Sequence, residues 1–137
     1  MIEPKKVMAT LEWTGGLRFS GGKPEATRML LDADGVEGPS PITALVCAAG
    51  ACSGADVVSI LEKKRVKVTR FQIDVGGRRA EEYPRRFVEL WLRFTLAGEG
   101  LTEVAARRAV ELSVEKYCSV LLSLNPDIPI TTEIVIE

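Results

Sequence analysis

The residues of this sequence most able to do chemistry are its three cysteines, Cys47, Cys52 and Cys118. The chain of 137 residues contains no histidine, so a Ser-His-Asp or Cys-His nucleophile is excluded within one chain. A typical Cys/His zinc site would have too few ligands, and no Cys-x-x-Cys pair is present. Any reaction must therefore use thiols, carboxylates, arginine, lysine or tyrosine.

Two of the cysteines lie close together in "ALVCAAGACSGADVV", residues 44–58. Each residue of a helix advances about 100°, so Cys47 and Cys52 lie about 140° apart and cannot share a face. Cys52 aligns with a stripe of small side chains that would let another backbone approach closely, whereas Cys47 is predicted to fill space on another face. Buried free cysteines often behave as small hydrophobes, so simple packing is the alternative for each thiol.

The N-terminal third of the chain predicts an antiparallel meander. Residues 7–13 alternate apolar and polar side chains, "TGG" at 14–16 predicts a turn, and strands should follow at 17–20 and around 26–31. The next segment, 32–41, is predicted to be a loop. Its "DADG" lacks the remaining ligands of an EF-hand, so no calcium site is expected.

Two long helices are predicted to carry the cysteines. The first runs from Ile42 to about Arg65 and is apolar around most of its circumference. Its polar interruptions and its Ala and Gly content favour a buried helix over a membrane span. The second begins after the N-cap Thr102 and runs to Leu124. Cys52 and Cys118 can therefore meet if the two helices pack together.

Alternating patterns at 68–75 and 87–96 predict two further strands, joined by a solvated loop, "GGRRAEEYPRR", and "ITTEIVIE" predicts a last strand. The order βββ-α-ββ-α-β indicates an α+β fold with an antiparallel sheet on the helices, in a single domain, 1–137. The net charge of −1, from 18 basic and 19 acidic residues, predicts no nucleic-acid and no membrane partner. The N-terminus lacks the apolar region of a signal peptide, so a cytoplasmic location is expected.

A resemblance to a known family is carried by two segments. "GPSPITALVCAAGACSGADVVSILEKKR", with the cysteine of "SVEKYCSV" 66 positions after Cys52, resembles the OsmC/Ohr family of osmotically inducible and organic hydroperoxide resistance proteins. The sequence of these two segments is more similar to the OsmC-like branch of the family than to the hydroperoxide resistance enzymes. The resemblance implies an intertwined homodimer, with antiparallel sheets wrapped around two long central helices, and no metal or organic cofactor.

The resemblance also implies roles for particular residues. Cys52 would attack a small organic hydroperoxide and become a sulfenic acid, and Cys118 would condense with it to a disulfide. A dithiol reductant such as a lipoyl group would reopen that disulfide. Arg18 matches the region of the family arginine that favours the thiolate.

The glutamate that holds this arginine in the family lies at the start of the first helix. Here Ile42 and Thr43 occupy the candidate positions, and neither can form the salt bridge. Three hypotheses follow: a thiol-dependent reductase of organic hydroperoxides, a non-catalytic dimeric redox-sensing or ligand-binding module, and a dimer whose cysteines only pack. The missing glutamate weighs against the first, and the two retained cysteines weigh against the third.

Overall fold

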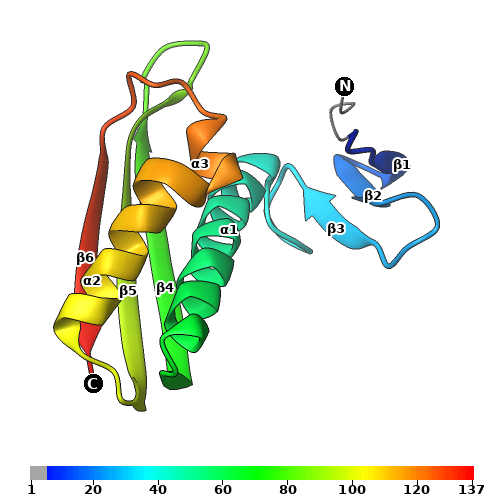
Figure 1. The fold of residues 1–137 in the computed structure, drawn as a ribbon. Helices are drawn as coiled ribbons and strands as arrows, with labels where there is room; N and C mark the ends of the chain where they lie inside the picture. The colour runs from blue at the N-terminus through cyan, green and yellow to red at the C-terminus, as the bar shows by residue number, and fades with distance from the viewer. Residues whose placement is uncertain (1–5) are drawn as a thin grey trace, which may run out of the picture. The chain divides into compact units, whose positions relative to one another are not determined.

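The computed structural model describes residues 6–137, which form two compact units, the first ending at Leu45 and the second covering Val46–Glu137. The elements, coloured along the chain in Figure 1, are β1 (Thr10–Gly15), β2 (Arg18–Gly22), β3 (Met29–Asp32), α1 (Pro41–Lys63), β4 (Lys67–Arg79), β5 (Phe87–Glu99), α2 (Glu103–Leu112), the π-helical turn η1 (Ser113–Tyr117), α3 (Ser119–Leu122) and β6 (Ile130–Ile136). The predicted α+β class and its order of strands and helices are confirmed.

The first unit is the predicted antiparallel meander, with the strand order β1-β2-β3. Its first strand begins at Thr10 rather than Val7. Gly15 and Gly16 have φ angles of +117° and +55°, the left-handed region that glycine enters without steric cost. The turn they form brings the start of β2 beside the end of β1, with Arg18 opposite Gly15 on one side and Asp32 on the other.

The second unit contains the sheet β4-β5-β6, with α1 and α2 on one face of it (Figure 1). β4 and β5 are antiparallel, as expected, but β6 pairs with β5 in parallel. The expectation of purely antiparallel sheets is wrong for this strand. The helical segment between β5 and β6 is a crossover that returns the chain to the end of the sheet where β5 began, so both strands run in one direction.

The core of the second unit lies between this sheet and the helices. On β5 the predicted inward positions Leu90, Leu92, Phe94 and Leu96 are all buried. On α1 the buried residues form one stripe: Ala49, Gly50, Ser53, Gly54, Val57 and Leu61. A Cβ atom placed on Gly54 would lie 2.7 Å from Cδ1 of Ile73, so a side chain of β4 packs directly on α1 at this glycine. Within residues 6–137 no backbone covers the stripe of small residues predicted beside Cys52, where Ala48, Ala55 and Ser59 are exposed.

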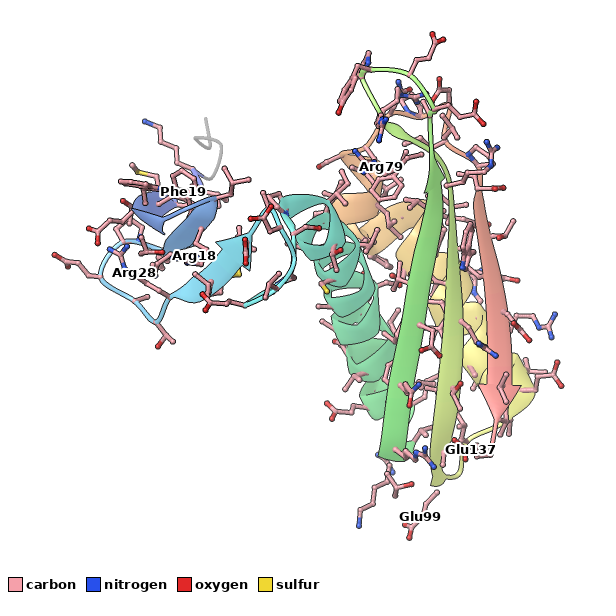
Figure 2. The ribbon with its side chains drawn as sticks, turned by 180° about the vertical axis from the view of Figure 1, so that it is seen from behind. Arg18, Phe19, Arg28, Arg79, Glu99 and Glu137 are labelled. Carbon is pink, nitrogen blue, oxygen red and sulfur yellow. The ribbon has the colours of Figure 1, made fainter. Side chains whose placement is uncertain are left out.

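The hairpin between β4 and β5 is longer than predicted. Gly76 and Gly77 belong to β4, so the connecting loop covers 80–86 only. On the opposite strand Trp91 pairs with Gly76, and its ring crosses Gly76 so closely that the indole leaves no room for a Cβ atom there. Figure 2 shows the sheet from the side away from the helices, with Arg79 near one end and Glu99 and Glu137 at the other.

The second predicted helix is not continuous. Its start is confirmed, because the N–H of Ala105 donates to Thr102 Oγ1 at 3.1 Å. However, α2 ends at Leu112, η1 follows, and Cys118 has extended backbone angles (φ −73°, ψ 98°) before α3 begins. The prediction of one helix to Leu124 is therefore wrong at the point where Cys118 lies.

By length and composition alone, α1 is apolar enough to cross a membrane, with a mean hydropathy of 1.8 in its most apolar window. One third of that window is buried inside the chain itself. Core helices of soluble proteins pass the same test, so the feature is weak evidence for a membrane.

Candidate thiol site

Cys118 lies at the break between η1 and α3, and its side chain is completely buried. Its N–H donates to the Ser113 carbonyl at 2.7 Å, which closes the π-helical turn. Its thiol lies 4.0 Å from the carbonyl of Ala49, to which S–H can donate, and it accepts the N–H of Leu121 at 3.4 Å. The break in the helix thus directs the Cys118 side chain towards α1.

Cys52 lies on α1 less than one turn after Ala49 and is half-buried. Its side chain is near enough to the Cys118 thiol to help raise the pKa of that thiol. The structure therefore brings together the two cysteines that the sequence predicts to meet. Cys47 is exposed. It lies on another face of the helix than Cys52, as the 100° rotation per residue predicts, and within this single chain it does not fill space between other side chains.

Burial raises the pKa of the Cys118 thiol from its ordinary value of 9.0 to about 11. The N–H of Leu121 acts in the opposite direction, while the Cys52 side chain and the carboxylate of Asp56 add to the increase. Because a thiolate is the nucleophilic form of cysteine, Cys118 is protonated at neutral pH and is a poor first nucleophile towards a peroxide.

A polar network lies beside the thiol pair. The Ser113 hydroxyl donates to Asp56 Oδ2 at 2.9 Å, and the Ser53 and Ser113 hydroxyl oxygens are 2.9 Å apart. Ser113 donates its only hydroxyl proton to Asp56, so Ser53 must be the donor in the hydrogen bond between the two serines. Both serines are completely buried. The sequence contains a signal for this network, since Asp56 follows Cys52 by about one helical turn and so shares its side of the helix, but the serine partners are not predictable from the sequence.

Asp56 also borders a hollow of about 440 Å³ in the second unit. The lining residues are Asp56, Ser59, Ile60, Lys63, Lys64, Leu112 and Tyr117. The carboxylate end of the network therefore reaches an open surface, while its serine end is closed to water. Among residues 6–137, no group of three or more thiols or carboxylates could hold a metal ion.

Arg18 belongs to the first unit, where its Nε lies 3.2 Å from Oε2 of Glu37. The sequence predicts that the glutamate of the family is missing at the start of the helix, because Ile42 and Thr43 cannot form a salt bridge with an arginine. Thr43 is engaged in the N-terminal cap of α1, where its Oγ1 accepts the Ser40 hydroxyl at 3.0 Å. Arg18 nevertheless has a carboxylate partner, which comes from the loop before the helix.

The loop that presents Glu37 is organised by Asp32. This carboxylate accepts the N–H groups of Asp34, Val36 and Glu37 at 3.0, 3.3 and 3.1 Å. The hydrogen bond from Glu37 is the largest cause that lowers the pKa of Asp32, against the opposing effect of burial. The "DADG" segment thus serves as a turn that fixes Glu37, a role that its acidic composition does not reveal.

Comparison with known proteins adds the family. The family model described as OsmC-like protein matches residues 32–133, a range that contains both Cys52 and Cys118. The chain belongs to the OsmC-like family. It is 41% identical over 126 residues to Protein YhfA of Escherichia coli, an alignment that covers 91% of this chain and 94% of that protein.

Solved structures agree with this membership. A hypothetical protein from Aquifex aeolicus is 31% identical, with a TM-score of 0.82 and 99% of each chain covered. An organic hydroperoxide resistance protein from Elizabethkingia anophelis is 14% identical, with a TM-score of 0.67 and 100% of each chain covered. At this low identity the second likeness shows a shared fold alone. The predicted OsmC/Ohr family and fold are confirmed.

Proposed function

We propose that this OsmC-like protein reduces small organic hydroperoxides through a dithiol-disulfide cycle between Cys52 and Cys118. The observation that carries the proposal is the pairing of a half-buried thiol with a completely buried one. The buried partner, Cys118, has a raised pKa and is suited to remain a thiol until it is needed. Cys52 is the more accessible of the two and is suited to attack first.

The proposed cycle has three balanced steps. The Cys52 thiolate attacks the outer oxygen of the hydroperoxide, the O–O bond breaks, and the alcohol leaves after taking up a proton. The Cys118 thiol then attacks the resulting sulfenic acid, forming the disulfide and releasing water. A dithiol reductant such as a lipoyl group reduces that disulfide by thiol-disulfide exchange and is itself oxidised. No metal or organic cofactor is required.

Arg18 is proposed as the cation that favours the Cys52 thiolate, since a thiol in apolar surroundings is otherwise mostly protonated at neutral pH. The pairing of Arg18 with Glu37 supports this role, because a carboxylate fixes the guanidinium. Glu37 would then replace the family glutamate that is missing at Ile42 and Thr43. This role rests on the resemblance and on the ion pair within the first unit.

We also propose that the active form is a homodimer in the cytoplasm. The face of α1 that carries Cys47, Ala48, Ala51 and Ala55 is exposed in the single chain. The first unit has an apolar hollow of about 410 Å³ lined by Leu11, Leu17, Phe19, Leu31, Ala33 and Pro41. Exposed apolar surface of this kind is typical of an interface, and a second copy would cover it. Sedimentation velocity should give twice the mass of one chain, and a monomer at micromolar concentration would contradict the proposal.

A redox sensor without turnover is the second candidate. It is favoured by the exposure of the Arg18–Glu37 pair, whose side chains keep 36% and 59% of their accessible surface, because exposed pairs hold their geometry weakly. Steady-state consumption of cumene hydroperoxide with dihydrolipoamide separates the two candidates. The peroxidase predicts continued turnover that Cys52→Ser abolishes and Cys47→Ser leaves intact. A single stoichiometric oxidation followed by no turnover would favour the sensor.

A further inference from the structure

Asp56 and Ser113 have no role in the proposed cycle, yet their hydrogen bond joins α1, which carries Cys52, to η1, which ends next to Cys118. We propose that Asp56, acting through Ser113, is a positioning residue that holds Cys118 against Cys52 for disulfide closure. The inference deepens the proposed function, on which it rests for its biological meaning.

Ser113 connects Asp56 to Cys118 through both its side chain and its main chain. The hydroxyl donates to Asp56 Oδ2 on α1 at 2.9 Å, and the carbonyl accepts the Cys118 N–H at 2.7 Å. The first bond anchors η1 to α1, and the second fixes the backbone of Cys118 relative to that anchor. A change at Asp56 can therefore reach Cys118 without any direct contact between the two side chains.

The π-helical turn makes this anchor important for the direction of the Cys118 side chain. In a continuous α-helix the Cys118 N–H would donate to Val114, four residues back. It donates instead to Ser113, five residues back. One extra residue in the turn rotates the following side chain by about 100° around the helix axis. Single π-helical turns are rare and often occur at functional sites, and here the turn ends at a thiol.

The direction of the hydrogen bonds in the network supports a fixed position of Ser113 relative to α1. Ser53, next to Cys52 in the chain, donates to Ser113, which donates to the carboxylate. A hydrogen bond to a carboxylate is stronger than one between neutral groups, and a chain of such bonds polarises its members. Both hydroxyls are completely buried, so neither is exposed to water in the folded chain.

The test uses a disulfide-forming oxidant that needs no peroxide chemistry. In a Cys47→Ser background only Cys52 and Cys118 remain. Diamide accepts two electrons and two protons from these thiols at its N=N bond, which leaves a hydrazine and the Cys52–Cys118 disulfide. The rate of closure is followed by the loss of free thiols and by the mass of the linked peptides.

We expect Asp56→Ala and Ser113→Ala to slow closure at least tenfold. Asp56→Asn keeps an oxygen that accepts the Ser113 hydroxyl, so it should close within about threefold of the parent. The matched control Glu62→Ala removes an exposed carboxylate from the same helix and should have no effect. Alkylation of Cys52 should keep its parental rate in every variant, which separates positioning from a general loss of structure.

Two results would overturn the inference: closure of Ser113→Ala at the parental rate, or Asp56→Asn as slow as Asp56→Ala. Failure of the parent protein to close with diamide would overturn it as well. If Asp56→Ala does not fold, the comparison of Ser113→Ala with the hydroxyl-keeping Ser113→Thr decides the question. A protein that closes with diamide as expected but does not consume peroxide would contradict the proposed function and leave this inference standing.

Discussion

The raised pKa of Cys118 predicts a large difference in reactivity between this thiol and an ordinary one. Its shift from 9.0 to about 11 lowers the thiolate fraction about 100-fold at any pH well below 9, because each pKa unit is a factor of ten. At pH 8 about 0.1% of Cys118 is ionised, against about 9% of an unperturbed thiol. Burial of the sulfur slows its reaction further.

The assay is alkylation of the reduced protein by iodoacetamide between pH 7 and pH 11, with the rate at each cysteine measured by peptide mass spectrometry. A peptide containing "KYCSV" is the unperturbed reference. We expect Cys118 to react at least 100-fold more slowly than this reference at pH 8, and its rate to keep rising towards pH 11. Alkylation that levels off near pH 9 would refute the assignment of Cys118 as the protonated partner.

Replacing Cys52 tests the causes of the shift separately. Cys52→Ala removes two of the influences that raise the pKa of Cys118, the side-chain contact and the charge, but leaves burial in place. The midpoint of the pH dependence of Cys118 alkylation should therefore fall below 11 and remain above 9.0. The Cys118 thiol loses its proton at a lower pH in the unfolded chain than in the folded one. The free energy of unfolding should therefore decrease as pH rises from 9 to 11. Cys118→Ala should lose this part of the pH dependence.

Two further predictions concern the supports of the site. Gly98→Ala places a methyl group 2.7 Å from the backbone oxygen of Lys67 on the paired strand β4, so urea unfolding should show a loss of about 1–3 kcal/mol, and an unchanged midpoint would mean that β4 and β5 are not paired there as described. Glu37→Gln removes the exposed partner of Arg18, so the free energy of unfolding should change by less than about 1 kcal/mol while peroxide turnover falls. Unchanged turnover would separate Glu37 from the activity, and Arg107→Gln is the control for loss of an exposed ion pair.

Much of the fold was predictable because it depends on local patterns. The alternation of Leu90, Leu92 and Phe94 identified the buried face of β5, and Thr102 identified the start of α2. That Cys52 and Cys118 could meet was predictable because both lie in apolar segments with helical spacing that must share one core, even though Cys118 itself lies at a break between two helical turns. These signals are repeated along the chain and need no knowledge of distant contacts.

The features that were missed depend on contacts between distant residues. In the sequence Val110, Val114, Cys118 and Leu121 keep the spacing of one continuous helix, so nothing around Ser113 marks the π-helical turn and the break before Cys118. Gly76 looks like a loop residue until Trp91, in the paired strand, covers it. Glu37 is one acidic residue in an acidic loop, and only the three N–H groups bound by Asp32 single it out.

The central claim is that Cys52 and Cys118 form a working dithiol pair, and one measurement tests it most directly. Fully reduced protein is mixed with one equivalent of cumene hydroperoxide, and the remaining thiols are counted by intact and peptide mass spectrometry. The structure predicts the loss of two thiols, a Cys52–Cys118 linkage and a free Cys47. In Cys118→Ser the reaction should stop at a sulfenic acid on Cys52. Three intact thiols after the reaction, or a disulfide that includes Cys47 within one chain, would contradict the account.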